Sequence, residues 1–385
     1  MTEPLLEVEN LKTRFYTEEG VVRAVDGVSF TVEQGEIVGL VGESGAGKSV
    51  AVSSILRLVE EPGEIVGGEV RFRDQLLFGL EEGPDGERRP REEMLSNREM
   101  RERIRGRKIA IIFQDPMESL NPVFTVGSQL REFIELNRDL GEAAAREAAV
   151  DMLREVGIPE PAERYDSYPH EFSGGMRQRV LIAMALSCEP SLIIADEPTT
   201  ALDVTVEGQI LELVDELQQE YETSFVWVTH DMGVVAEICD RVNVMYLGEI
   251  VEQAEVEDLF YDTKHPYTDA LLQSIPRPDE TVEELNPISG VMPEAIDPPA
   301  GCRFHTRCPD AREVCPRINP DLREVADGTH PHRAACIKHD AFDVGYWESE
   351  PLGEAADKAF GGDIRTDGDG ASTDERTPTD EGVSR

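Results

Sequence analysis

The sequence predicts an α/β fold built around a phosphate-binding loop, followed by a small, irregular C-terminal domain that contains cysteines. Three observations support this prediction. A β-branched run at 36–41 leads into a glycine-rich segment and then into a helical pattern. Two further apolar runs, at 191–198 and 223–230, are typical of buried strands in a parallel sheet. Beyond residue 276 proline becomes frequent, and four of the six cysteines gather within 302–336.

The chain is strongly acidic. It has 79 Asp and Glu residues against 37 Lys and Arg, which gives a formal net charge of −42. Nucleic acid is therefore not expected as a partner, because its binding surfaces need clustered basic side chains. Only six of the basic residues are lysine, a pattern that favours a halophilic protein from a salt-rich cytoplasm. An acidic surface that simply maintains solubility is the alternative.

The sequence lacks the usual signals for membrane insertion and secretion. Its longest apolar run, VLIAMALSC at 180–188, is shorter than the roughly 18 residues that a membrane span needs. The first ten residues have no basic region followed by an apolar stretch, so we expect no signal peptide. The cytoplasm is then the expected compartment, and its cysteines would be reduced there.

The segment GESGAGKS, at 42–49, matches the phosphate-binding pattern G-x-x-x-x-G-K-[ST] in full. Its glycines let backbone N–H groups converge on phosphate oxygens, and the following helix adds its positive N-terminus. Lys48 can reach the β- and γ-phosphates of ATP, and Ser49 can bind Mg²⁺. A chance glycine-rich turn is the alternative, but the strand before and the helix after argue against it. The expected nucleotide contacts here are Gly42, Ser44, Gly45, Gly47, Lys48, Ser49 and Val50.

A pair of carboxylates ends the apolar run SLIIADEP at 191–198. Asp196 is placed to join a Mg²⁺ shell, and Glu197 to polarise an attacking water. A strand-end carboxylate pair satisfied by helix caps is the alternative. The phosphate-binding loop favours the catalytic interpretation, because phosphoryl transfer requires both phosphate cradling and metal ligands.

The segment EFSGGMRQRV supplies a second predicted anion site. Its residues Ser173, Gly174 and Gly175 open a helix whose first N–H groups would bind an anion. With these motifs the chain resembles the ATP-binding-cassette (ABC) family. The remaining family motifs follow, namely the Q-loop with Gln114 in IFQDP, the D-loop with Asp203 in TALDV, and the switch histidine His230 in VTHD.

The resemblance implies a cassette with a RecA-like core, an antiparallel β subdomain and a helical subdomain at about 115–188. Two cassettes would enclose two ATP molecules head to tail. Each ATP would lie between the phosphate-binding loop of one cassette and residues 173–175 of the other, with Asp203 close to the nucleotide. Phe15 would stack on the adenine, and Tyr16 is the alternative.

The resemblance also implies catalytic roles. Glu197 would act as the general base on the attacking water, and His230 would contact the γ-phosphate. Gln114 would coordinate Mg²⁺ together with Ser49 and Asp196. It would also couple metal binding to motion of the helical subdomain.

Three further segments, IFQDPMESLNPVFTVG, IPEPAERYDSYPHEFSGGMRQRV and HPYTDALLQSIP, are similar to the ATP-binding subunits of dipeptide and oligopeptide importers. The chain is most similar to the dipeptide-type D subunit. The implied partners are two permease subunits, a second ATPase subunit that we expect to be a sister chain, and an extracytoplasmic solute-binding protein. The chain would bind the permeases through residues 114–127, on the cytoplasmic face of the cell membrane. Nickel or another solute is an alternative cargo, and a soluble non-transport ABC ATPase is a more distant alternative.

The predicted domains are a nucleotide-binding domain at 1–260, a C-terminal domain at 261–345 and a disordered acidic tail at 346–385. The charge-dense stretch 79–106 is expected to be a solvated surface insertion. The C-terminal domain has few apolar residues, so we expect a metal centre to stabilise it. Its proposed ligands are Cys302, Cys308, Cys315 and Cys336.

Four thiolates suit either Zn²⁺ or a [4Fe–4S] cluster. The lack of a C-x2-C pair favours the cluster, and the resemblance favours it too, because relatives of this subunit carry one. Zn²⁺ is the main alternative. We expect ATP binding at Lys48 to be independent of this metal site.

The acidic composition predicts that stability depends on salt. With a formal net charge of −42, repulsion among exposed carboxylates should destabilise the folded chain at low ionic strength. Salt screens this repulsion, because the Debye length falls from about 10 Å at 0.1 M to about 3 Å at 1 M. The melting temperature should therefore rise between dilute buffer and molar KCl, measured by circular dichroism. An unchanged melting temperature would contradict salt adaptation and leave the ATPase assignment untouched.

Overall fold

The computed structural model describes most of the chain. The predicted acidic tail lies outside the described residues from residue 353 onward. Among the described residues, no helix is both long enough and apolar enough to cross a membrane. The described ranges are 3–83, 87–115, 119–200, 202–274, 288, 290–325, 330–339 and 349–352.

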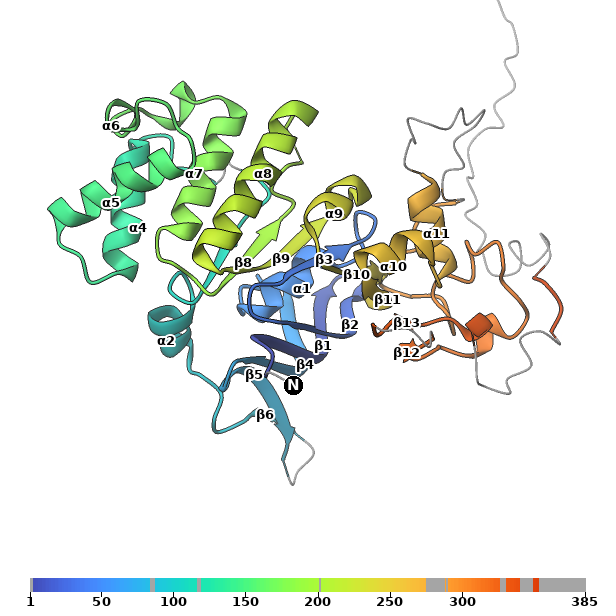
Figure 1. Cartoon of the computed structure of the whole chain (residues 1–385). Coiled ribbons are helices and arrows are strands. Elements are labelled where there is room, and N and C mark those ends of the chain that lie inside the picture. Colours follow the sequence, from blue (N-terminus) through green and yellow to red (C-terminus); the bar gives the residue numbers. More distant parts are fainter. Residues whose placement is uncertain are drawn as a thin grey trace, which may run out of the picture.

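An eight-stranded sheet forms the centre of the molecule (Figure 1). Its strands β10, β3, β9, β8 and β7 run parallel, which confirms the predicted parallel sheet. β3, β8 and β9 are buried along their whole length, as expected for strands covered on both faces. The strand order is β12 (Arg323–Glu324), β13 (Arg333–Ala334), β11 (Glu249–Glu255), β10 (Arg241–Tyr246), β3 (Ile37–Val41), β9 (Ser224–Thr229), β8 (Leu192–Asp196) and β7 (Ile109–Ile112).

A second, antiparallel sheet of five strands packs against this centre, as the resemblance implied. Helix α1 (Lys48–Ile55) contacts β1 and β2 of this sheet and β8 of the central sheet, so it lies between the two. Its side chains Ala51, Val52 and Ile55 are completely buried there. The strand order is β2 (Gly20–Val32), β1 (Leu6–Thr17), β4 (Gly63–Phe72), β5 (Gln75–Glu82) and β6 (Arg88–Pro90).

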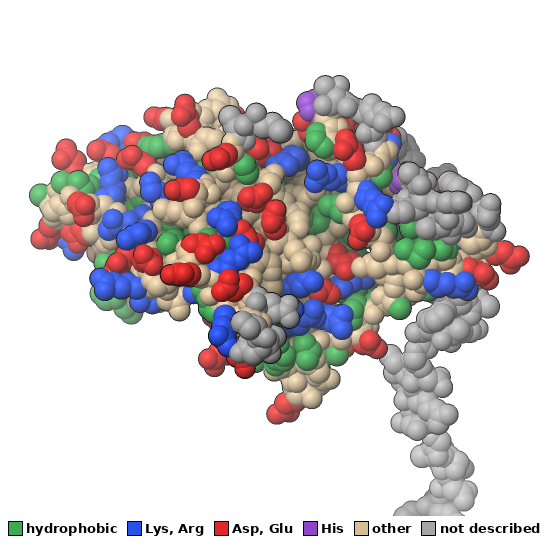
Figure 2. Space-filling model, turned by 90° about the horizontal axis from the view of Figure 1, so that it is seen from below, with side chains coloured by type: hydrophobic (Ala, Val, Ile, Leu, Met, Phe, Trp, Pro, Cys, Tyr) green, Lys and Arg blue, Asp and Glu red, His purple; other side chains and the backbone are tan. Residues whose placement is uncertain are grey.

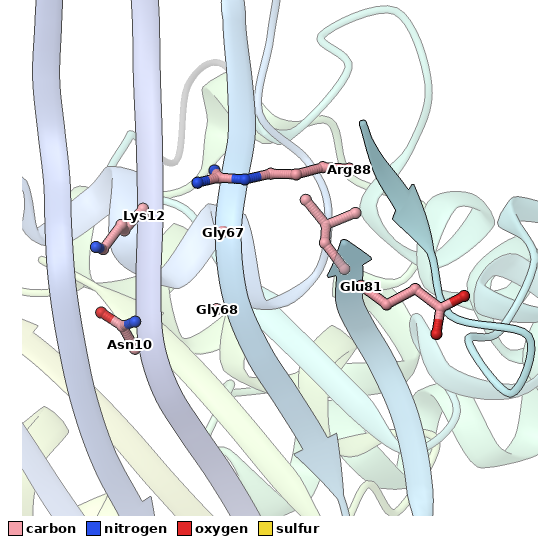
Figure 3. A pocket seen from close by; sticks show the side chains of 7 residues that line it. Asn10, Lys12, Gly67, Gly68, Glu81 and Arg88 are labelled. Carbon is pink, nitrogen blue, oxygen red and sulfur yellow. The ribbon is translucent and has the colours of Figure 1, made fainter. Parts of the chain in front are cut away.

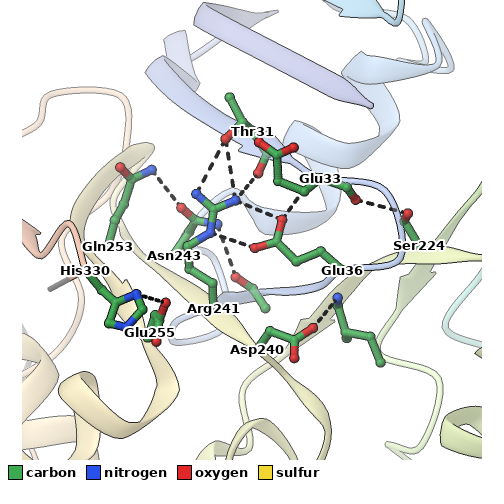
Figure 4. Close-up of polar contacts among 12 residues, drawn as sticks. Thr31, Glu33, Glu36, Ser224, Asp240, Arg241, Asn243, Gln253, Glu255 and His330 are labelled. Atoms are coloured by element: carbon green, nitrogen blue, oxygen red, sulfur yellow. Dashed lines mark hydrogen bonds and ion pairs between the residues drawn. The ribbon is translucent and has the colours of Figure 1, made fainter. Parts of the chain in front are cut away.

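An arginine network joins the two sheets at the start of β3 (Figure 4). The guanidinium of Arg241 donates to both carboxylate oxygens of Glu36, at 2.8 and 3.0 Å, and to the carbonyl oxygen of Thr31 at 2.7 Å. The carboxylate of Asp240 accepts the N–H of Ile37 at 2.8 Å. These charge-assisted bonds fix the strand that leads into the phosphate-binding loop.

Helices α4 to α7 form a lobe at one end of the molecule, and α8 and α9 cover one face of the central sheet (Figure 1). The lobe matches the expected helical subdomain. Figure 2 shows acidic and basic side chains interspersed over one face of the molecule, the lobe included. The helices are α4 (Val126–Asn137), α5 (Glu142–Glu155), α6 (Pro161–Arg164), α7 (Gly174–Leu186), α8 (Val204–Tyr221) and α9 (Met232–Ile238).

The prediction of a solvated insertion at 79–106 is wrong for its second half. There α2 (Asn97–Glu99) continues into one π-helical turn (Met100–Ile104), whose end residues Met100 and Ile104 are completely buried. The guanidinium of Arg105 donates to the carbonyl oxygen of Leu56, just after α1. The spacing of four places both apolar side chains on one face, and the surrounding charges concealed this pattern in the sequence.

The described part of the C-terminal segment, residues 256–274, 288, 290–325, 330–339 and 349–352, packs against the edge of the central sheet through β13. Strand β13 pairs with β11, and the buried carboxylate of Glu252 in β11 accepts the N–H of His265 at 3.0 Å and lies 2.7 Å from Nε2 of His332. These contacts bond β13, His265 and His332 to strand β11 of the cassette. The helices among its described residues are α10 (Val256–Tyr261), α11 (Pro266–Gln273) and the 3-10 turns Cys315–Arg317 and Ile337–His339.

Candidate nucleotide-binding site

The phosphate-binding loop between β3 and α1 is held between the two sheets. Gly42, Gly45 and Gly47 have φ values of 154°, 84° and 100°, which L side chains rarely adopt. A Cβ at Gly42 would lie 2.2 Å from the carbonyl oxygen of Met245, and one at Gly47 would lie 2.0 Å from that of Ala24. Met245 belongs to β10 and Ala24 to β2, so only glycine lets the loop pass between them.

Lys48 occupies the inside of this loop. Its ammonium donates to the carbonyl oxygens of Gly42 at 2.8 Å and Glu43 at 3.1 Å, and its side chain is 4% exposed. Burial lowers the pKa of Lys48, whereas the nearby carboxylates of Glu197 and Asp196 act in the opposite direction. A bound phosphate could replace the two carbonyl oxygens as the partner of this cation.

Ser49 and Asp196 form a group of oxygen donors beside the loop. The Ser49 hydroxyl donates to Oδ1 of Asp196 at 2.9 Å, and burial raises the pKa of that carboxyl. Mg²⁺ prefers oxygen ligands, and it usually takes one or two carboxylates while phosphates and waters complete its shell. The two side chains therefore fit the predicted Mg²⁺ site.

Glu197 follows Asp196 with an unusual backbone conformation. Its φ is 46°, in the left-handed region that a non-glycine residue rarely adopts, and its N–H donates to the carbonyl oxygen of Val228 at 2.9 Å. The strained turn directs the side chain back toward Lys48, whose ammonium lies 3.7 Å from Oε1. Strain of this kind often occurs at functional sites.

Three side chains hold the carboxylate of Glu197. Gln114 and Thr200 each donate to Oε2 at 3.0 Å, and Nδ1 of His230 lies 3.3 Å from Oε1. The structure thus brings together Glu197, Gln114 and His230, the three residues to which the resemblance assigns catalytic roles. Thr200 was missed, although its position three residues after Glu197 in a turn could have indicated it.

Residues 173–175 are positioned by the contact between α7 and α8. The Ser173 hydroxyl accepts the N–H of Met176 at 3.3 Å, and the Asp203 carboxylate accepts the N–H of Val206 at 3.1 Å. A Cβ at Gly175 would lie 2.5 Å from Val206, so glycine permits this close packing. Ser173, Gly174 and Asp203 are exposed, and no described hydrogen bond or ion pair joins them to the phosphate-binding loop of the same chain.

The candidate adenine contact, Phe15, lies on β1. It is half-buried over Gly63 and shares a face of the strand with Thr13, whose hydroxyl lies 2.7 Å from that of Ser54 in α1. Tyr16 is 51% exposed and projects from the opposite face. This alternation favours Phe15 over Tyr16 as the residue that would contact the adenine, because Phe15 lies on the face of β1 that is turned toward α1.

The four C-terminal cysteines line one small pocket of about 20 Å³, together with His265 and Phe304. Burial raises the pKa of each thiol, to about 12 for Cys308 and about 11 for Cys336. Among the described residues, no three His, Cys, Asp or Glu side chains converge closely enough to hold a single metal ion.

Two other features fall outside the predicted site. A pocket of about 200 Å³ on the antiparallel sheet is lined by Asn10, Lys12, Glu81 and Arg88, none of which the motifs indicated (Figure 3).

Glu43, within the phosphate-binding loop, is contacted by Arg307 and Tyr267 from the C-terminal segment. The sequence gives no sign of these pairs, because no local pattern relates residues so far apart.

Comparisons with known proteins agree with this geometry. A family model described as ABC transporter matches residues 25–200, and one described as oligopeptide/dipeptide transporter, C-terminal region, matches residues 251–315. A probable peptide ABC transporter ATP-binding protein of Sinorhizobium fredii is 51% identical over 86% of this chain and 94% of its own. The chain belongs to the ABC transporter family. It is an ABC ATPase that also has the C-terminal region of the oligopeptide/dipeptide group.

Further relatives of this ABC ATPase include the dipeptide transport ATP-binding proteins of Bacillus subtilis and Escherichia coli. The first is 48% identical over 83% of this chain and 90% of its own, and the second 44% over 84% and 94%. A solved dimeric ATP-binding cassette, in a post-hydrolysis state with ADP and Pi, has a TM-score of 0.55 and 26% identity over 65% of this chain and 98% of its own. The cbiO1 protein of Clostridium perfringens, part of an ABC transporter complex, has a TM-score of 0.54 and 27% identity, covering 68% and 92%.

Proposed function

We propose that this ABC ATPase powers the import of dipeptides or oligopeptides. The observation that carries the proposal is the carboxylate of Glu197, held by Gln114, Thr200 and His230 beside the phosphate-binding loop. The peptide cargo is supported by the matching C-terminal region and by relatives that are named as dipeptide and oligopeptide transport ATP-binding proteins.

ATP would bind with its phosphates inside the loop. Lys48 would exchange the carbonyl oxygens of Gly42 and Glu43 for phosphate oxygens, with which it forms stronger, charge-assisted bonds. The loop N–H groups from Gly42 to Val50, including those of Ser44 and Gly45, would hold the β- and γ-phosphates. The adenine would stack on Phe15.

Mg²⁺ would be held by oxygen atoms of Ser49, Asp196 and Gln114, and would neutralise charge on the phosphates. Glu197 would accept a proton from the attacking water. The water oxygen would bond to the γ-phosphorus as the bond to the β–γ bridging oxygen breaks, which gives ADP and phosphate. His230 would contact the γ-phosphate, and the hydrogen bonds from Gln114 and Thr200 would keep the base oriented.

A second cassette would complete each ATP site. Ser173 and Gly174 are exposed at the N-terminus of α7, with Asp203 exposed at the start of α8. Facing the phosphate-binding loop of another chain, these groups would bind the γ-phosphate from the opposite side. The solved dimeric cassette with ADP and Pi supports this arrangement, and we expect a sister chain as the partner.

The permease subunits would dock between β7 and α4. Large apolar side chains are exposed there, with Phe113 at 47%, Val123 at 70% and Phe124 at 55%. Exposed apolar clusters of this kind mark protein interfaces. Two permeases would hold the chain on the cytoplasmic face of the membrane and receive peptide from an extracytoplasmic solute-binding protein.

The cargo is tested by isolating the assembled complex and titrating its solute-binding protein with dipeptides, oligopeptides and Ni²⁺. We expect this protein to bind the peptides.

The four cysteines would bind a [4Fe–4S] cluster that stabilises the C-terminal domain. They line one pocket, and thiolates are the ligands that such clusters use. A [4Fe–4S] cluster would take one cysteine on each of its irons, and a single Zn²⁺ bound by the same four thiolates is the alternative.

Glu197→Gln should lower ATP turnover by about 100-fold or more in the assembled transporter, because the amide cannot accept the proton. ATP binding should persist, because the phosphate contacts remain. Phosphate release and nucleotide titration measure the two effects. Glu222→Gln is the matched control, because Glu222 has a similar φ of 51° but lies exposed outside the site. Hydrolysis near the wild-type rate in Glu197→Gln would refute the role of this carboxylate.

Anaerobically purified protein should be brown, absorb near about 400 nm and contain about four irons per chain. Replacing any of the four cysteines by serine should remove the colour and the iron. Cys188→Ser, outside the pocket, should keep both. Colourless protein with about one zinc per chain would show instead that the site binds Zn²⁺.

A further inference from the structure

A partly buried ion pair connects the C-terminal segment to the phosphate-binding loop. Nη1 of Arg307 lies 2.7 Å from Oε2 of Glu43, and Nη2 lies 3.0 Å from Oε1, so the pair makes two parallel bonds. The Arg307 side chain is only 4% exposed, and its guanidinium lies 5.9 Å from the ring centre of Tyr246. A bidentate pair in this position is rigid and weakly screened by salt.

The same loop residue is contacted from two other directions. Its N–H donates to the hydroxyl oxygen of Tyr267 at 2.9 Å, and its carbonyl oxygen accepts from Lys48 at 3.1 Å. The Tyr267 ring packs against Tyr246 at 4.6 Å and Phe304 at 5.3 Å between ring centres. Glu43 is therefore fixed through its side chain, its N–H and its carbonyl group.

The groups that hold Glu43 are part of the chain that forms the cysteine pocket. Arg307 directly precedes Cys308, and Phe304 lies between Cys302 and Cys308 in the sequence. The N–H of Arg307 donates to the carbonyl oxygen of Phe304 at 3.0 Å, and that of His305 donates to the carbonyl oxygen of Cys302 at 3.0 Å. Because these turns are tight, a displacement of Cys302 or Cys308 would also displace Phe304 and Arg307.

We propose that Arg307 is a positioning residue for the phosphate-binding loop, through which the four-cysteine site sets the affinity for ATP. The inference rests on the proposed role of the loop as the ATP site. While Arg307 holds Glu43, the loop is ordered before ATP arrives. When the cysteine pocket loses its shape, the loop becomes ordered only as ATP binds. Part of the binding free energy is then used to order the loop, and the affinity for ATP falls. Such coupling would differ from the expectation that ATP binding at Lys48 is independent of the metal site.

The test measures ATP affinity and amide hydrogen exchange of residues 42–49 in the full chain. Arg307→Ala should weaken ATP binding by about 5- to 10-fold, within the usual range of site-to-site coupling, and speed exchange in the loop. Arg317→Ala is the matched control, since Arg317 is exposed in the same segment, and it should change neither. Arg307→Lys, which keeps the charge but loses the two-bond geometry, should fall between them.

The coupling itself is tested with Cys308→Ser. This variant should weaken ATP binding and speed amide exchange in the loop. In a chain that already carries Arg307→Ala it should cause little further change in either, because the contact between Arg307 and Glu43 is already lost. Equal losses in both backgrounds, or an Arg307→Ala variant within twofold of Arg317→Ala, would overturn the inference. If Arg307→Ala does not fold, Glu43→Gln tests the pair from the other side with the same expected loss. Unchanged affinity in Lys48→Ala would instead overturn the ATP site, and the inference with it.

Discussion

The confinement of the phosphate-binding loop between two sheets is the constraint on which the rest of the structure depends. Carbonyl groups of Ala24 and Met245 press on it from opposite sides, and leave room only for Gly47 and Gly42. The strand β3 that enters the loop is buried throughout, and the helix α1 that leaves it lies between the sheets. The loop backbone is thus shaped in advance for phosphate, without contribution from the ligand.

The groups proposed to react gather around this loop. Lys48 and Ser49 start α1, and their partners Asp196 and Glu197 arrive at the end of β8, two strands away. The left-handed φ of Glu197 directs its carboxylate to the cation and away from the strand axis. In the proposed function these groups would form one side of an ATP site, while Ser173 at the start of α7 is exposed. This division explains why a cassette of this family would need a second one for turnover.

Local patterns in the sequence were sufficient to locate the phosphate-binding loop and the parallel strands. They also singled out Lys48, Ser49, Asp196 and Glu197 as candidate site residues. These features could be predicted because the residues that determine a glycine-rich turn, a buried strand or a strand end are neighbours in the sequence. Pairs such as Glu43 and Arg307 were not predictable, since only the folded chain brings them together. The buried residues Met100 and Ile104 were concealed by the charges around them. The four cysteines led us to predict a metal site, but their spacing could not show that Arg307, the neighbour of Cys308, would contact Glu43 in the loop.

The most direct measurement is a structure of the chain with Mg²⁺ and a non-hydrolysable ATP analogue. We predict that Nζ of Lys48 leaves the carbonyl oxygens of Gly42 and Glu43 and binds the β- and γ-phosphates. Ser49 and Asp196 should share the metal ion, and Glu43 should keep its bonds to Arg307. Nucleotide bound elsewhere, with Lys48 still bonded to both carbonyl oxygens, would contradict the account.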